Sequence, residues 1–210
     1  MDLTEARMKL LDAAEELFYE RGVQAVGMDE IRSASGVSLK RLYQVFPSKA
    51  ELLRAYLERR DVRWRTQVME YADSRADGEE RILAVYDWLR DWFAEPDFRG
   101  CAFINSYGEL GAVDPAVAEA ARHHKSAFGA YVASLVKDAG RPAELAGPLV
   151  LLAEGAMATA AITRSADAAG QARQGASMLL RATEPRPRGR PEYETTGPTP
   201  AGSLPADPGD

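Results

Sequence analysis

The sequence has only one cysteine, Cys101, among its 210 residues. A single cysteine excludes an internal disulfide and any metal cluster built on several cysteines. A run of about 18 apolar residues is also missing, so we expect no membrane-spanning helix. The first residues, Met1-Asp2-Leu3-Thr4-Glu5, are acidic and lack the basic and apolar blocks of a secretory signal. These absences predict a cytoplasmic protein.

Segments with the two-residue period of β-strands are absent as well, and so are internal repeats. Apolar residues instead recur every three or four positions, which is typical of helices with one buried face. We therefore predict an all-α protein. Its expected helices cover residues 4–21, 28–35, 38–46, a long segment from 48, 79–93, 114–139, 144–163 and 168–182.

The predicted helix ends carry the expected signals. Gly22 lies just past the first helix, where a left-handed backbone is easiest for glycine. Pro47 ends the third helix, because the residue before a proline avoids helical geometry. Ser48 and Glu51 have the spacing of a capping box, in which each side chain satisfies a free backbone donor of the other residue. This box predicts the start of the fourth helix.

The net charge of −6 argues at first against nucleic acid, which usually binds basic proteins. The charges are unevenly distributed, however. Between Arg32 and Arg65 there are nine basic side chains and only three acidic ones, Glu51, Glu58 and Asp61. A local basic surface on an acidic protein is compatible with DNA binding.

The second and third predicted helices are short and meet at Gly36, which is the arrangement of a helix-turn-helix. On the third helix, Leu42, Val45 and Phe46 share one side, and polar side chains lie on the other. Arginine and lysine favour guanine O6 and N7, and glutamine favours adenine N6 and N7. The candidate DNA-reading residues are therefore Lys40, Arg41 and Gln44. The alternative is that they form a plain solvated surface.

A string of motifs runs in order through the first third of the chain: Leu10-Leu11-Asp12-Ala13-Ala14-Glu15-Glu16-Leu17-Phe18, Gly22-Val23, Met28-Asp29-Glu30-Ile31, Gly36-Val37-Ser38, Leu42-Tyr43, Phe46-Pro47-Ser48-Lys49 and Glu51-Leu52-Leu53. This string resembles the tetracycline-repressor (TetR) family of transcription regulators. The resemblance implies a homodimer in which a three-helix, helix-turn-helix head binds operator DNA and a larger helical body binds an effector and forms the dimer.

Carried over by position, the resemblance assigns Tyr43 and Lys49 to phosphate contacts and Ser38 to the start of the reading helix. The chain also departs from the family's pattern. Leu39-Lys40-Arg41 stands where many members have Lys-Gly-Thr, and Gly27 replaces a usual serine or threonine. The added positive charge favours DNA binding, but the operator sequence stays open.

The body resembles a subgroup that carries a Gly-Cys-x-Phe segment, here Gly100-Cys101-Ala102-Phe103. The family resemblance implies an apolar or aromatic effector. Aromatic residues at helical spacing are otherwise more often plain core. The candidate effector-pocket residues are Trp88, Trp92, Phe103, Asn105, Tyr107, His124, Phe128, Glu154 and Met157.

Small residues on the last two predicted helices allow close helix approach. These residues are Gly155, Ala156, Ala160, Gly175 and Ala176. Packing within one chain is the plain interpretation, and the resemblance implies that these two helices form the homodimer. From Pro185 onward the chain is rich in proline and almost devoid of apolar residues, so it cannot offset its ordering entropy. We predict a disordered tail there.

Two enzymatic or metal-binding alternatives can be weighed. Cys101 with His123 or His124 has the residue types of a nucleophile and base, but no third group positions them. Adjacent histidines on a helix project about 100° apart and do not easily chelate one metal. We therefore predict no enzyme activity, no metal and no cofactor.

The sequence predicts a helix-turn-helix head over residues 1–47, an effector-binding and dimerisation body over 48–184 and a tail over 185–210. The expected function is that of a repressor released from its operator by a small molecule, although activation is also compatible with the sequence. The alternative from another class is a helical small-molecule-binding protein whose head no longer reads DNA.

Overall fold

The computed structural model describes residues 2–75 and 78–183. Within these ranges the chain is helical without any strand, as predicted for an all-α protein. The predicted Pro-rich tail lies outside the described residues. The helices are α1 (Leu3–Arg21), α2 (Met28–Ser35), α3 (Leu39–Val45), α4 (Lys49–Asp73), α5 (Glu79–Phe93), α6 (Ala102–Leu110), α7 (Pro115–Asp138), α8 (Ala146–Thr163) and α9 (Asp167–Ala182), with a short 3₁₀ turn at Ala143–Leu145.

Side-chain caps explain several of these boundaries. The Asp2 carboxylate accepts a hydrogen bond from the Glu5 backbone N–H at 2.8 Å and begins α1. Asp114 does the same for the N–H of Ala116 at 2.9 Å, and Pro115 occupies the first turn of α7 as predicted. Gly36 ends α2 in the left-handed region, with φ 65° and ψ 15°.

A capping box has two hydrogen bonds, and it was predicted at Ser48. The structure forms one of the two types at Ser48 and the other type at Gly27. At Ser48, the Glu51 backbone N–H donates to the serine hydroxyl at 3.2 Å, which is one half of the box. At Gly27, the backbone N–H donates to the Glu30 carboxylate at 2.9 Å. A carboxylate three residues into a helix can therefore cap its start even where the first residue has no side chain.

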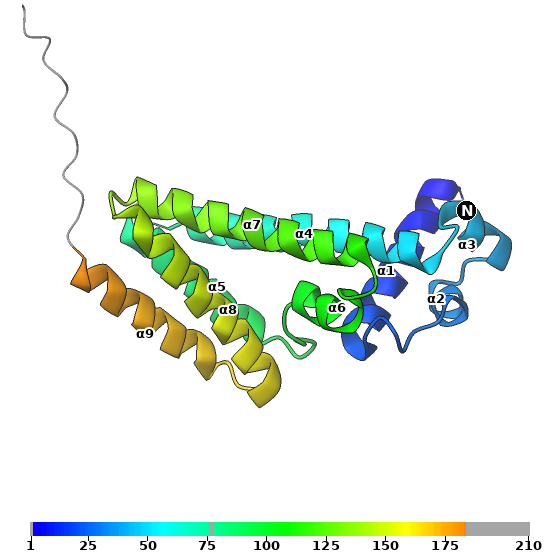
Figure 1. The fold of residues 1–210 in the computed structure, drawn as a ribbon. Coiled ribbons are helices and arrows are strands. Elements are labelled where there is room, and N and C mark those ends of the chain that lie inside the picture. Colours follow the sequence, from blue (N-terminus) through cyan, green and yellow to red (C-terminus); the bar gives the residue numbers. More distant parts are fainter. Residues whose placement is uncertain (1, 76–77, 184–210) are drawn as a thin grey trace, which may run out of the picture.

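The first three helices form a head at one end of the molecule, next to the start of α4 (Figure 1). Helix α1 packs against α2, α3 and α4. The residues that close this small core are fully or almost fully buried. They are Leu10, Phe18, Ile31, Leu42 and Phe46.

The remaining helices form an elongated body in which α4 and α7 lie side by side (Figure 1). Helix α5 packs against α4, α7, α8 and α9, and α8 packs against α9. Helix α6 is short and lies between this body and the head (Figure 1). Because α4 contacts both α1 and the body helices, it links the two parts.

One segment of the body is unusually apolar. The segment Ala143–Thr163 is long and apolar enough to cross a membrane by length and composition, with a mean hydropathy of 1.7 over 18 residues. A search for an uninterrupted apolar run missed it because Glu144 and Glu154 interrupt the pattern. In the fold this segment packs against α5, α7 and α9. Its apolarity therefore serves in part to pack the body, and such a helix alone is weak evidence for a membrane span.

Candidate DNA interface and head–body junction

Helix α3 presents its polar side to solvent. Leu42 is fully buried against the head, and Val45 is half-buried. Ser38, Lys40, Tyr43 and Gln44 are exposed, with 48% of Tyr43 accessible. Four of the six residues assigned to DNA contact therefore lie on a surface that a DNA groove can reach.

The two other residues assigned to DNA contact are less accessible. Arg41 is half-buried, and its backbone N–H donates to the Ser38 hydroxyl at 3.4 Å. Lys49 is half-buried too, with its ammonium 5.9 Å from the centre of the Phe18 ring. Ser38 therefore begins α3 as a cap and keeps its hydroxyl proton available for a phosphate oxygen.

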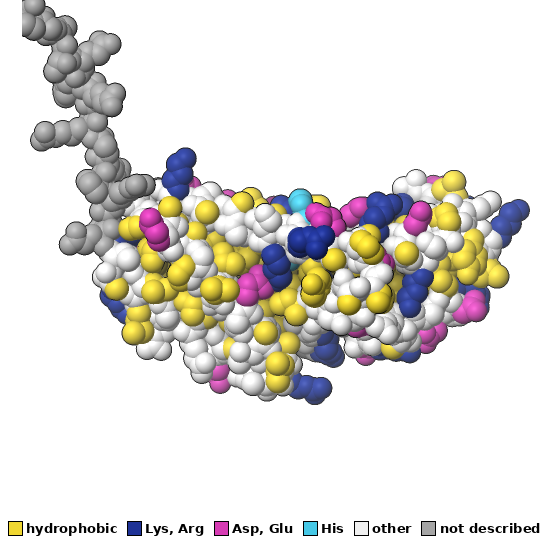
Figure 2. Space-filling model, in the orientation of Figure 1, with side chains coloured by type: hydrophobic (Ala, Val, Ile, Leu, Met, Phe, Trp, Pro, Cys, Tyr) yellow, Lys and Arg dark blue, Asp and Glu magenta, His cyan; other side chains and the backbone are white. Residues whose placement is uncertain are grey.

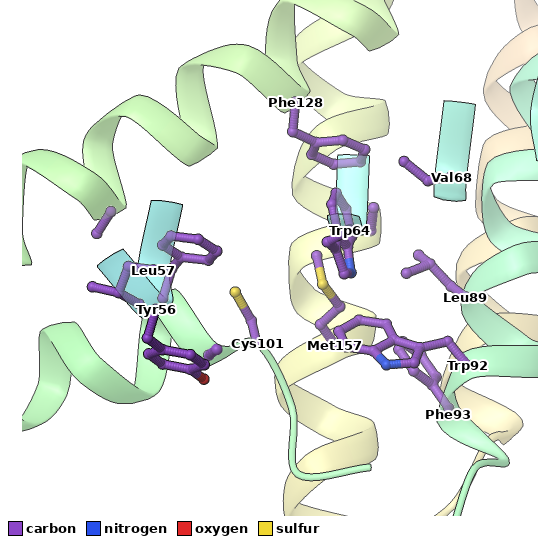
Figure 3. Packing of buried hydrophobic residues seen from close by; sticks show 14 of the residues in the cluster. Tyr56, Leu57, Trp64, Val68, Leu89, Trp92, Phe93, Cys101, Phe128 and Met157 are labelled. Carbon is purple, nitrogen blue, oxygen red and sulfur yellow. The ribbon is translucent and has the colours of Figure 1, made fainter. Parts of the chain in front are cut away.

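Several of the residues assigned to the effector pocket converge in the body on Trp64. The Trp64 ring centre lies 5.2 Å from Trp88, 5.9 Å from Trp92, 5.0 Å from His124 and 5.3 Å from Phe128, each in an edge-on arrangement. Figure 3 shows Trp64, Trp92, Phe128 and Met157 pointing toward one another. This aromatic cluster is closely packed, so a ligand placed there has to displace side chains.

Three other pocket residues lie elsewhere. The Asn105 amide donates to the backbone carbonyl of Arg99 at 2.9 Å, and Asn105 is exposed. Tyr107 is 52% accessible on the outer side of α6. Glu154 is half-buried and accepts from the Lys125 ammonium at 2.5 Å. Phe103 remains with the cluster, where its ring stacks on His124 at 3.9 Å.

A buried ionic network adjoins the aromatic cluster. His124 Nδ1 lies 2.7 Å from Asp61 Oδ1, and Arg65 binds the same carboxylate through Nε at 3.0 Å and Nη2 at 2.6 Å. Burial lowers the pKa of His124 to about 4, although its hydrogen bond to Asp61 opposes this effect. Burial acts to raise the pKa of Asp61, but hydrogen bonds from Arg65 and His124 outweigh it and hold that pKa below the usual value. His124 is therefore neutral in the folded protein at neutral pH.

This network predicts a pH-dependent stability. Unfolded His124 takes up a proton near pH 6.5, whereas the folded protein resists protonation down to about pH 4. The unfolded state binds more protons in this window, so stability falls as the pH drops through it, by about 2–3 kcal/mol. Urea unfolding of the wild type and of His124→Gln at pH 7 and pH 4.5 measures the effect. Protonation of Asp61 changes the stability mainly below this pH range, because the pKa of Asp61 in the folded protein is lowered. Equal losses in both proteins would contradict the assignment to His124.

Cys101 contacts a lysine and not the histidines with which it was paired as a possible nucleophile and base. The Lys125 ammonium donates to Cys101 Sγ at 3.4 Å and also binds Glu154. Among the described residues, no group of three or more His, Cys, Asp or Glu side chains is arranged to hold a metal ion.

The end of α6 is tied to the loop after α1, so the body contacts the head directly. The Glu109 carboxylate accepts hydrogen bonds from the backbone N–H of Val23 at 3.0 Å and of Gln24 at 2.7 Å. The Gln24 amide donates in return to the Glu109 carbonyl at 2.6 Å. Gly22 has φ 86°, and a Cβ there would lie 2.9 Å from the Glu109 carboxylate. The backbone conformation thus favours glycine here, and a side chain would in addition displace the Glu109 carboxylate.

A second contact joins the head to the loop before α6. The Tyr19 hydroxyl donates to the Gly100 carbonyl at 2.8 Å and accepts from the Arg99 backbone N–H at 3.0 Å. We call these two contacts, centred on Glu109 and Tyr19, the head–body junction. Because of these contacts, a movement of α6 relative to the body would also shift the end of α1.

The junction predicts a measurable loss of stability when Glu109 is truncated. In Glu109→Ala, the two backbone donors of Val23 and Gln24 lose a charged acceptor, which costs about 1–3 kcal/mol. Urea denaturation measures the free energy of unfolding. Glu119→Ala, which removes an exposed carboxylate paired with Arg122, is the control and should change it by less than about 0.5 kcal/mol. A matched effect in both variants would show that the junction adds nothing.

The α8–α9 face is an exposed apolar surface. Leu151 is 72% accessible and Met178 is 59% accessible. With Pro148, Leu152 and Leu179 they line an open groove of about 690 Å³. Figure 2 shows apolar side chains gathered over this part of the body. Contiguous apolar surface of this kind marks an interaction site.

Sequence analysis did not single out Trp64, Asp61 or Glu109 as functional. Trp64 and Asp61 continue the inward face of α4 at helical spacing from Leu57, so extending that pattern would have found them. Glu109 contacts residues more than 80 positions away in the sequence. Helical periodicity carries no information on such a contact.

A three-helix head with an exposed helix α3, joined through α4 to a larger helical body, defines a helix-turn-helix regulator. Residues 10–56 match the model of the bacterial regulatory proteins of the tetR family, and residues 78–176 match that of the tetracyclin repressor-like C-terminal domain. The chain belongs to the TetR family of transcription regulators.

Solved structures support the assignment to this family over most of the chain. A TetR-family transcriptional regulator from Streptomyces coelicolor is 31% identical, with a TM-score of 0.79 over 85% of this chain and 96% of that one. A putative TetR regulator from Streptomyces avermitilis is 32% identical, with a TM-score of 0.73 over 84% and 97% of the two chains.

Curated relatives match over a shorter segment. The transcriptional activator FasR of Mycolicibacterium smegmatis is 40% identical over 100 residues, which is 48% of this chain and 45% of FasR. The transcriptional repressor KstR2 of Rhodococcus jostii is 36% identical over 85 residues, or 39% and 42% of the two chains. The match therefore spans less than half the length of these relatives, one of which is an activator and the other a repressor.

Proposed function

We propose that this protein is a cytoplasmic repressor that binds operator DNA as a homodimer and is released by a small-molecule effector. The observation that carries the proposal is the exposed side of α3, on which Lys40, Tyr43 and Gln44 face solvent. In a helix-turn-helix, this is the helix that enters the major groove. We assign base contacts to Lys40, Arg41 and Gln44 and phosphate contacts to Ser38, Tyr43 and Lys49.

Each part of the chain has its own proposed role. Residues 1–47 form the DNA-binding head, residues 48–184 form the effector-binding and dimerisation body, and residues 185–210 form the tail. The α8–α9 face is the proposed homodimer contact, because its exposed apolar residues need a partner and its small residues allow close approach. A symmetric pair of heads would then meet two operator half-sites.

Effector release needs a ligand that prefers one arrangement of the heads over the other. The aromatic cluster around Trp64 is the proposed effector site, because it offers several faces to an apolar or aromatic molecule. Phe103 belongs both to this cluster and to α6. A ligand that moves Phe103 would disturb α6 and, through Glu109, the loop that follows α1.

Fluorescence anisotropy of the purified protein on its own upstream intergenic DNA, with a scrambled duplex as control, tests the DNA-binding part. Tight binding to the intergenic DNA alone, across a salt series, is expected. Equal and weak binding to both duplexes that disappears with salt would mean non-specific phosphate contact. If a wider operator search also failed, the alternative of a helical binding protein with a non-reading head would replace this proposal.

A further inference from the structure

A small polar cavity lies between the head and the body, apart from the aromatic cluster's interior. It has a volume of about 180 Å³, well above what a single water molecule needs. Its walls come from the end of α1, the middle of α4, the end of α5 and the loop that follows α5. The lining residues are Tyr19, Arg60, Arg63, Trp64, Gln67, Trp92, Glu95 and Asp97.

One side of this cavity has an excess of positive charge. Arg59, Arg60 and Arg63 all bind the buried carboxylate of Glu15, and Arg59 also binds Asp12. Three guanidinium groups therefore share two carboxylates. Arg60 is 8% accessible and holds its guanidinium 4.3 Å from the Tyr19 ring centre. Arg63 lines the cavity and its side chain is half exposed, so its guanidinium group is accessible to an incoming anion.

The opposite rim has an excess of negative charge. Glu95 and Asp97 are both exposed, and neither forms an ion pair with a residue in the described ranges. Partial desolvation of its carboxyl group and the neighbouring Asp97 raise the pKa of Glu95, while Arg60 and Arg63 act to lower it. The two carboxylates thus lie close enough to disfavour each other's charge, which an incoming cation would relieve.

Two tryptophans also line the cavity, but little of either side chain is accessible. Trp64 and Trp92 both line the cavity, and their ring centres are 5.9 Å apart. A cavity with guanidinium groups from α4 and, from the loop after α5, carboxylates without an ion pair to a described residue complements a small molecule that carries both charges.

We propose that this cavity binds a small zwitterion of the α-amino-acid type. Arg63 and Arg60 bind its carboxylate, Glu95 and Asp97 bind its ammonium, and the accessible edges of Trp64 and Trp92 contact its side chain. This cavity adjoins the proposed effector site and shares Trp64 and Trp92 with it, so the inference rests on the proposed function, although occupancy of the cavity does not depend on DNA binding. The bound molecule would bridge α4 to the loop that leads into Gly100, the residue bound by Tyr19.

Isothermal titration calorimetry on the full chain without DNA tests the proposal with three matched probes. L-Leucine carries both charges, 4-methylpentanoate lacks the ammonium and 3-methylbutylamine lacks the carboxylate. We expect leucine to bind at least about tenfold more tightly than either analogue, because each loses a charged contact. All three tryptophans lie within the aromatic cluster, so tryptophan emission should change with the same affinity.

Variants locate the two ends of the ligand. Asp97→Asn changes an exposed residue without an ion pair, so folding should be unaffected and the preference for leucine over 4-methylpentanoate should fall about tenfold. Arg63→Gln should weaken leucine and 4-methylpentanoate alike. Glu80→Gln and Arg122→Gln, exposed positions away from the cavity, are the controls and should change nothing. No leucine binding to the wild type, equal affinity for leucine and 4-methylpentanoate, or an unchanged preference in Asp97→Asn would each overturn the proposal.

Discussion

Operator binding by the Lys40→Ala/Arg41→Ala double variant is expected to be at least about 100-fold weaker than that of the wild type. A good contact between a basic side chain and a guanine edge contributes about 1–3 kcal/mol, and this variant removes two candidates at once. Anisotropy on the operator at fixed salt measures the loss. The variant should keep the fold, since Lys40 is exposed and Leu42 still anchors α3 in the head.

A matched control separates base reading from general charge. Arg122→Ala/Lys137→Ala removes the same charge from exposed positions on α7 in the body. We expect its operator affinity to stay within about threefold of the wild type, because α7 belongs to the body and α3 to the head (Figure 1). If the head variant kept wild-type affinity, or lost no more than the control, α3 would not be the reading helix.

If the protein is the proposed homodimer, Leu151→Glu is expected to convert it to monomers and to weaken operator binding by about 100-fold or more. Leu151 is 72% accessible in the single chain and lines the groove of the α8–α9 face. In a two-fold interface the same substitution occurs twice, and each buried carboxylate without a partner costs several kcal/mol. A monomer then holds a single operator half-site.

Light scattering coupled to size-exclusion chromatography measures the oligomeric state. Val113→Glu is the control, because Val113 is 77% accessible but lies in the turn between α6 and α7, away from the α8–α9 face. It should remain dimeric and bind DNA normally. A dimeric Leu151→Glu would move the interface to another face. Monomers of both variants would show that surface charge in general disrupts the assembly.

Local signals in the sequence were sufficient for most of the fold. The bounds of α2 were predicted as the structure has them, because Gly27 and Gly36 bracket a short apolar pattern. Asp114 and Pro115 likewise placed the start of α7. These boundaries depend on backbone chemistry within a few residues, which the sequence contains directly.

The candidate sites were harder to predict because they depend on contacts between distant segments. Asn105 and Tyr107 were assigned to the pocket from their neighbourhood in the sequence, yet both are exposed on α6. The direction of a short helix is set by what it packs against, and no periodicity specifies that. Trp64 was missed although it lies at the centre of the aromatic cluster, because the inward face of α4 was followed only as far as Leu57.

The connection between body and head was also beyond local patterns. Glu109 is one carboxylate among many in an acidic chain, and its role arises only because α6 places it beside Val23 and Gln24. Gly22 was expected to have a left-handed backbone at the end of α1. Its φ is positive, but the ψ of 155° leads the chain away from the helix, and a side chain would meet Glu109.

Hydroxyl-radical footprinting of the wild type on its operator tests the central claim most directly. A homodimer that places α3 of each chain in the major groove predicts two equivalent protected regions, related by two-fold symmetry and about one helical turn or slightly more apart on one face of the duplex. Protection of one half-site alone, or uniform protection without symmetry, would contradict this account.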